Sequence, residues 1–242
     1  MRRIAFFVEG ASEMLFVEKL LIEVASAKNI VVNKTKIRGG GKSGKHPKRY
    51  AEVGATQEVS NEKFYAIIYD CGGDQAVGQR IKEEHQNLTD KGYHTLVGVR
   101  DVRPDFSRDE IELLRDGMQK VVDKSLVPVV FVLSAMEVEA WFLAEYSHFE
   151  RVHPELTPDL ILRELGFDPR EFNPSDRENP AADLEQTYLL KGVVYDKFEV
   201  EKTINVLDFN HIYLEVAEGI PELKLLSATV DNFLTLDDPQ TS

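Results

Sequence analysis

Five short runs of β-branched and aromatic residues recur along the first part of the chain, and segments with helical spacing separate most of them. Strands that alternate with helices in this way predict an α/β fold with a mostly parallel sheet flanked by helices. The runs are almost continuously apolar, which is typical of strands covered on both faces. The predicted strands are Arg3–Val8, Ile30–Ile37, Phe64–Tyr69, His94–Val99 and Val127–Leu133.

Four helices are predicted between and after these strands. The first begins at Ser12, whose hydroxyl suits a helix N-cap, and the second spans about Gln75–Leu88. The third spans about Ser107–Lys124, where acidic residues follow the serine and complement the positive end of the helix. The fourth begins near Met136 and is expected to pack Trp141 in the core.

The pattern changes after about Tyr146. Five of the ten prolines lie between Pro154 and Pro180, which predicts short helices joined by turns and not another strand–helix–strand unit. The remainder of the chain has mostly helical spacing. We therefore predict an α/β domain over residues 1–146 and a mostly helical C-terminal subdomain over residues 147–242.

Composition and charge narrow the choice of partners and compartment. Among 242 residues, 42 acidic and 29 basic side chains give a formal charge of -13, which opposes broad adhesion to nucleic acid or membranes but allows a local basic patch. The apolar run Ile4–Val8 is far shorter than the roughly 20 residues of a membrane span, and it does not form a secretory signal. The single cysteine, Cys71, excludes an intrachain disulfide, so a cytoplasmic location without membrane contact is predicted.

Acidic residues follow four of the predicted strands. Ligands of open parallel sheets bind beyond the carboxyl ends of the strands, and carboxylates gathered at one edge repel each other unless a cation lies among them. Oxygen ligands favour a hard divalent ion, so Mg²⁺ or Mn²⁺ is the predicted cofactor. The candidate ligands are Glu9, Glu13, Asp70, Asp74, Asp101, Glu137 and Glu139.

The segment around Gly10 places two of these acids at a strand-to-helix turn. Gly10 permits a tight turn, and side chains of the first helical turn lean back toward its N-terminus, so Glu13 can approach Glu9. The simpler interpretation is that Glu13 only complements the helix dipole and that Glu9 is a solvated strand end.

Two segments carry a family resemblance. Residues 7–13 (FVEGASE) resemble the first motif of Toprim domains of the OLD nuclease type, and residues 136–145 (MEVEAWFLAE) resemble a later motif of RloB-like proteins from prokaryotic defence loci. The resemblance implies a Toprim-like Rossmannoid fold and metal-assisted cleavage of phosphodiester bonds. It also implies catalytic roles for Glu9, Glu13 and Asp70.

One position departs from the Toprim pattern. Such domains usually carry Asp-x-Asp after the third strand, whereas Gly72 stands in the place of the second aspartate here. Asp74 or Asp101 can take that role, with Glu9 and Asp70 as the main metal ligands and Glu137 and Glu139 as outer support. The missing aspartate also leaves open a noncatalytic module that binds nucleic acid or a partner protein.

A basic segment between Lys34 and Arg49 holds seven lysines or arginines and no acid. We predict that it binds a phosphate backbone through Lys42, Lys45, Lys48 and Arg49; a solvated loop is the alternative. Residues Gly39 to Lys45 of the same segment match most of the P-loop motif. His46 follows in place of the magnesium-binding hydroxyl, so nucleotide hydrolysis is not expected from it.

The predicted function is a Mg²⁺- or Mn²⁺-dependent nuclease of a prokaryotic antiviral defence system, with DNA favoured over RNA. The alternatives are the noncatalytic module and a small-molecule phosphoesterase or nucleotidyl transferase. OLD-type nucleases are typically coupled to an ATPase, so a separate ATPase chain is the expected partner, docked beyond residue 146, and a homo-oligomer is possible. Lys197 resembles part of a Tyr-x-Lys element of related proteins, although a surface role is favoured for it.

Overall fold

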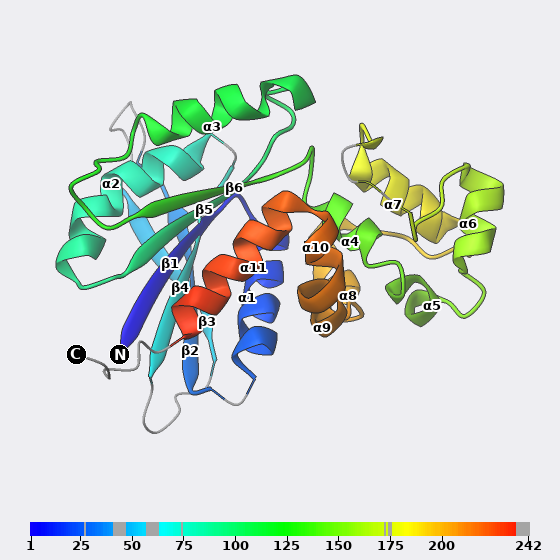
Figure 1. Ribbon diagram of the computed structural model, residues 1–242, viewed down its shortest axis with the longest axis horizontal. Helices are drawn as coiled ribbons and strands as arrows, with labels where there is room; N and C mark the ends of the chain where they lie inside the picture. The colour runs from blue at the N-terminus through cyan, green and yellow to red at the C-terminus, as the bar shows by residue number, and fades with distance from the viewer. Residues whose placement is uncertain are drawn as a thin grey trace.

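A six-stranded sheet in the order β3-β2-β4-β1-β5-β6 forms the centre of the protein (Figure 1). All neighbouring strands are parallel except β2 and β3, which are antiparallel. The strands are β1 (Arg2–Val8), β2 (Ile30–Arg38), β3 (Arg49–Ala55), β4 (Phe64–Asp70), β5 (Thr95–Asp101) and β6 (Val129–Ser134). The computed structural model describes residues 1–26, 28–40, 47–56, 63–73, 75–171, 173 and 176–235.

The α/β class and the mostly parallel sheet flanked by helices are confirmed, and the five predicted strands are present within about two residues of their expected ends. Strand β3 is not among the predicted strands. This strand lies at the edge of the sheet, and almost all of its residues are exposed. It therefore lacks the apolar run that marks the other strands.

Helices cover both faces of the sheet (Figure 1). On one face lie α1 (Ala11–Ala25) and α11 (Pro221–Leu234), and on the other lie α2 (Ala76–Asp90) and α3 (Ile111–Gln119). Side chains of β1 alternate between the two faces, so that Phe6 joins the core under α1 while Phe7 joins the core under α2. Burial on both faces explains the continuous apolar run of this strand.

Two helix starts refine the predictions. The N-cap of the first helix is Gly10, two residues before the expected Ser12, and the helix begins at Ala11. The Glu13 carboxylate accepts a hydrogen bond from the Gly10 amide at 3.0 Å. Ser107 is an N-cap as predicted, but it begins a short 3-10 turn, and α3 ends at Gln119.

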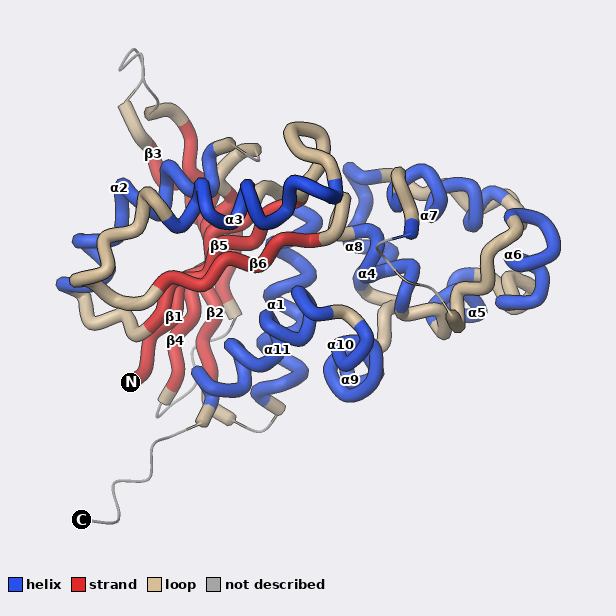
Figure 2. Tube along the Cα trace, turned by 45° about the horizontal axis from the view of Figure 1, so that its top comes forward, coloured by secondary structure: helices blue, strands red, loops and turns tan. Residues whose placement is uncertain are grey.

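The C-terminal part of the chain is helical, as predicted. Figures 1 and 2 show α5, α6 and α7 in a lobe that extends away from the sheet. Among the described residues, no helix has the length and apolar character that crossing a membrane requires. The remaining helices are α4 (Glu139–Ala144), α5 (His148–Val152), α6 (Pro158–Leu165), α7 (Pro180–Leu189), α8 (Val200–Ile204), α9 (Phe209–His211) and α10 (Ala217–Gly219).

The last helix returns to the sheet. One hydrophobic core contains Phe6 of β1, Phe16 of α1 and Leu226 of α11, and it continues into the lobe through Ile161 and Leu184. The last strand, β6, ends at Ser134, and the helices that follow it share this core with the sheet, so the core does not break at residue 146. The two lobe residues are fully buried, so they are not free to bind a partner chain.

Replacement of Leu226 by Ala should lower the free energy of unfolding by about 2–5 kcal/mol, because this side chain is fully buried between α11 and its neighbours. The adjacent Leu225 is 37% exposed, and Leu225→Ala should cost less than about 1 kcal/mol. Urea denaturation of both variants measures the difference. Equal effects would show that α11 does not belong to the core.

Candidate metal centre

The strand order opens a crevice between β1 and β5. After β1 the chain runs through α1 to β2 on one side, and after β5 it runs through α3 to β6 on the other. Adjacent strands whose connections leave in opposite directions mark the usual ligand-binding position of an open α/β sheet. Glu9 follows β1 directly, and Asp101 is the last residue of β5, so both acids border this crevice.

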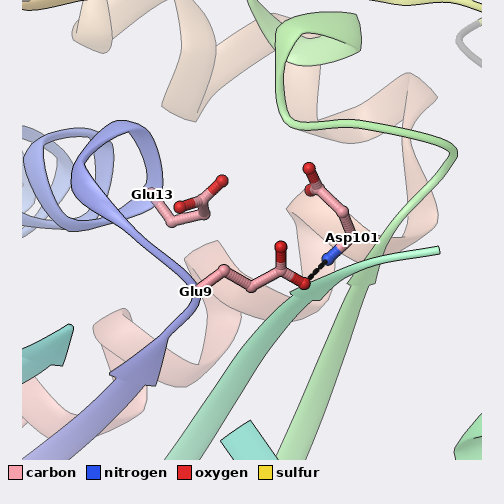
Figure 3. Close-up of side chains that lie close together, drawn as sticks. All are labelled: Glu9, Glu13 and Asp101. Carbon is pink, nitrogen blue, oxygen red and sulfur yellow. Dashed lines mark hydrogen bonds between the residues drawn. The ribbon is translucent and has the colours of Figure 1, made fainter. Parts of the chain in front are cut away.

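Three carboxylates converge there (Figure 3). Glu9, Glu13 and Asp101 each offer one oxygen, and these oxygens lie within 4.8 Å of one another. Glu9 Oε1 accepts a hydrogen bond from the Asp101 amide at 2.6 Å, which fixes its position relative to β5. Glu13 reaches the cluster from the first turn of α1, and its capping contact with Gly10 orients it. The three acids can together hold a cation.

The cluster lies in a cleft of about 320 Å³ that five carboxylates and two basic side chains line. Glu137 lines it from the turn after β6, and Glu139 lines it from the first position of α4. In the turn, Met136 adopts a left-handed conformation with φ of 67°. A non-glycine residue in that region is uncommon and turns the chain sharply. The basic lining residues are Arg103 and Lys197.

The C-terminal region supplies the opposite wall of the cleft. Lys197 Nζ lies 3.4 Å from Glu139 Oε1 and 3.7 Å from Glu137 Oε1. Tyr195 donates its hydroxyl proton to Glu139 at 2.8 Å, and the Ala181 amide at the start of α7 donates to Glu137 at 3.0 Å. Glu137 and Glu139 are thus both held by donors of the C-terminal region.

Burial and repulsion shape the charge of the inner carboxylates. Burial raises the pKa of the Glu13 carboxyl to about 7, and the Glu139 carboxylate acts in the same direction. Burial also raises the pKa of Asp101 well above its usual range, with a further contribution from Glu13. Burial alone would lower the pKa of Lys197, but Glu139 and Glu137 outweigh it and raise that pKa. The lysine therefore stays charged at neutral pH.

The pKa of Glu13 predicts that cation binding weakens below neutral pH. Between its ordinary value of 4.5 and about 7, Glu13 keeps its proton in the folded protein but loses it in the unfolded chain. The stability of the cation-free protein therefore declines as the pH rises through this window. A bound cation needs the ionised carboxylate, so the gain in melting temperature on adding Mg²⁺ should grow from about pH 6 to about pH 8. Thermal unfolding with and without Mg²⁺ measures both trends, and a pH-independent Mg²⁺ effect would contradict them.

The predicted ligands Asp70 and Asp74 differ from this group. Asp70 ends β4 on the far side of β1, where it accepts a hydrogen bond from the Gly72 amide at 2.9 Å and lies 3.5 Å from Lys36 Nζ. It is absent from the cluster and from the lining of the cleft. The structure thus joins Glu9 to Asp101 and not to Asp70. Asp74 lies outside the described residues.

The predicted nucleic-acid-binding residues are only partly visible, because Lys42 and Lys45 lie outside the described residues. The segment is not simply a loop: its first part belongs to β2, and Arg49 begins β3. Lys48 forms ion pairs with Glu84 at 2.5 Å and Glu83 at 3.1 Å. It therefore ties the start of β3 to α2, whereas Arg49 is exposed.

Lys197 and Tyr195 belong to the site but are not among the predicted site residues. Lys197 is about half exposed, as a surface lysine is, and it also lines the cleft. The available signal was the Tyr-x-Lys element itself. Its two side chains both contact Glu139.

No family model matches the chain, and no match was found among the curated proteins. A solved structure described as a "putative cell surface hydrolase" from Lactobacillus plantarum WCFS1 is similar to part of it. The sequence identity is 12% and the TM-score 0.30, over 56% of this chain and 53% of that chain. The chemistry of the cleft therefore has to be argued from its own residues.

Proposed function

We propose that the protein is a Mg²⁺- or Mn²⁺-dependent nuclease that hydrolyses phosphodiester bonds in the cleft between β1 and β5. The observation that carries the proposal is the convergence of Glu9, Glu13 and Asp101 within 4.8 Å at the carboxyl edge of the sheet. Three carboxylates so close together favour a cation among them, since the ion removes the repulsion that raises their proton affinity.

The donor set suits a hard divalent ion. Carboxylate oxygens are the ligands that Mg²⁺ and Mn²⁺ prefer, and such ions keep open positions for water and substrate phosphate. Lys197, one of the two basic residues that line the cleft, pairs with Glu137 and Glu139. When bound, the ion would neutralise phosphate charge and supply a nucleophilic water at neutral pH.

Residues of the cleft would accept and donate the protons of the reaction. Glu9, fixed by the Asp101 amide, is placed to accept a proton from the attacking water. Lys197 stays protonated, so it can hold a phosphate oxygen or donate a proton to the leaving oxygen. Tyr195 and Glu139 position that lysine.

A defence role and a separate ATPase partner are further parts of the proposal, and the Toprim resemblance supports both. The near-P-loop at Gly39–Lys45 lacks the hydroxyl residue that would bind magnesium. Any nucleotide control would accordingly come from another chain. DNA is the favoured substrate.

The purified protein should cleave plasmid DNA, single-stranded DNA or RNA when Mg²⁺ or Mn²⁺ is added, and EDTA should stop the reaction. Glu9→Gln keeps the acceptor for the Asp101 amide but loses the charge, and it should lower the rate by about 100-fold or more. Leu225→Ala, on the exposed side of α11, serves as the control. Binding of nucleic acid without cleavage by the wild type would favour the noncatalytic module instead.

A further inference from the structure

We propose that Phe198 is a stacking platform for an unpaired base, which makes single-stranded nucleic acid the preferred substrate of the cleft. The inference rests on the proposed function, because it specifies the form of nucleic acid that the same site accepts. Its evidence is the exposure of one ring, its place beside Lys197 and the fixed backbone that carries it.

Phe198 is fully exposed, with a relative accessibility of 100%, the highest among the exposed large hydrophobic residues of the described part. Single exposed aliphatic side chains are common on protein surfaces. A whole aromatic ring in water is different, because its large apolar surface favours contact with a flat apolar partner. The ring is therefore available for a ligand.

Its position connects the ring to the cleft. Phe198 directly follows Lys197, which lines the cleft together with the acid cluster. Adjacent Cα atoms lie only about 3.8 Å apart. A strand whose phosphate sits beside Lys197 would thus carry its neighbouring base past Phe198.

The backbone that carries the ring is fixed on both sides. The Phe198 amide donates to Asp196 Oδ1 at 2.8 Å, and the Glu199 amide donates to the Asp196 carbonyl at 2.9 Å. Tyr195 anchors the same turn to Glu139. A phenylalanine on such a turn loses little conformational freedom on binding, since its side chain has only two torsions.

The surroundings favour a base over a protein partner. The exposed residues that flank Phe198 in the sequence are charged: Asp196, Lys197, Glu199, Glu201 and Lys202. A stable protein interface buries about 800 Å² on each partner, whereas one ring offers the area of a single base. Bases of a single strand stack on aromatic side chains in this way, while the faces of paired bases in a duplex are already covered.

Cleavage assays provide the first test, with a labelled single strand and the matching duplex as substrates. Phe198→Ala should lower kcat/KM for the single strand by roughly 5- to 100-fold, the range expected for one lost stacking contact, and should change duplex cleavage little. Phe198→Trp should retain the preference. Leu162→Ala, on α6 and 44% exposed, is the matched control and should behave as the wild type.

Fluorescence provides a second test that does not need cleavage. In Phe198→Trp, the new indole is exposed whereas the native Trp141 is fully buried, so oligothymidylate should quench the added signal. The assay uses a Glu13→Gln background to prevent cleavage. An abasic strand of equal length should not quench it, and neither strand should quench Leu162→Trp.

The outcomes separate the two proposals. If the wild type cleaves nothing, the proposed nuclease fails, and base-dependent quenching alone still decides whether Phe198 stacks. Cleavage with no difference between Phe198→Ala and wild type, together with no quenching, would overturn the stacking proposal and leave the nuclease intact. A dimer in sedimentation velocity that Phe198→Ala abolishes would also overturn it, because the ring would then belong to an interface between two copies.

Discussion

Replacing Glu13 with Gln is expected to stabilise the cation-free protein and to abolish its stabilisation by divalent cations. Glu13 is buried beside Asp101 and Glu9, and burial raises its pKa to about 7. Above that pH the folded protein holds a carboxylate that the site disfavours. Gln removes the charge but keeps an oxygen that accepts the hydrogen bond of the Gly10 amide, so the start of α1 should be preserved.

The expected gain at about pH 8 is roughly 1–3 kcal/mol in the free energy of unfolding. That corresponds to about 2–4 °C in melting temperature per kcal/mol for a chain of this size. The same substitution removes a ligand, so Mg²⁺ or Mn²⁺ should no longer raise the melting temperature. Thermal and urea unfolding, each with and without the ion, measure both effects.

Glu18 on the same helix provides a control, because its substitution should change the free energy of unfolding in the opposite direction. Its carboxylate pairs with Lys34 Nζ at 2.7 Å, so Glu18→Gln should destabilise the protein by about 1–3 kcal/mol. It should leave the effect of the cation unchanged. If Glu13→Gln destabilised the protein as much as Glu18→Gln, or if the cation effect survived it, the acid cluster would not be a metal site.

The buried strands of the sheet could be predicted because each carries its own signal. Strands covered on both faces are apolar throughout, and Ile4–Val8 shows this within a few residues. The edge strand β3 has no such requirement, since its residues face water. Its hydrogen-bonding partner is β2, a strand outside its own local pattern, so local sequence does not reveal it.

The candidate site, too, could be predicted only in part from the sequence. The rule that ligands bind beyond strand ends identified Glu9, Asp70 and Asp101, but it does not say which strands are neighbours across the crevice. That depends on the strand order, which places β4 and β5 on opposite sides of β1. Lys197 lines the cleft and Tyr195 binds Glu139, although both follow Asp101 by more than 90 residues, so their role depends on tertiary packing.

The second large effect is expected from substitution of Asp101. It tests whether every acid at a strand end binds the ion or only those beside the crevice between β1 and β5. Asp101→Asn keeps the acceptor for the Ser134 hydroxyl and the amide that binds Glu9, but it removes one of the three clustered charges. The rate of metal-dependent cleavage and the affinity for the ion should each fall by at least about 100-fold. Substitution of residues that only support metal ligands commonly lowers metal affinity or activity by 10- to 100-fold.

Asp70→Asn should behave differently, although Asp70 also stands at a strand end. Its oxygen can still accept the hydrogen bond from Gly72, and the lost partner is Lys36, whose side chain is 31% exposed. We expect less than about a fivefold change in ion affinity, the equivalent of a weak ion pair. Calorimetric titration with Mn²⁺ and a cleavage assay on the same preparations compare the two variants. The opposite result, a large loss of ion affinity in Asp70→Asn and a small one in Asp101→Asn, would place the ion between β1 and β4. Asp70 ends β4, and β4 is the neighbour of β1 on that side.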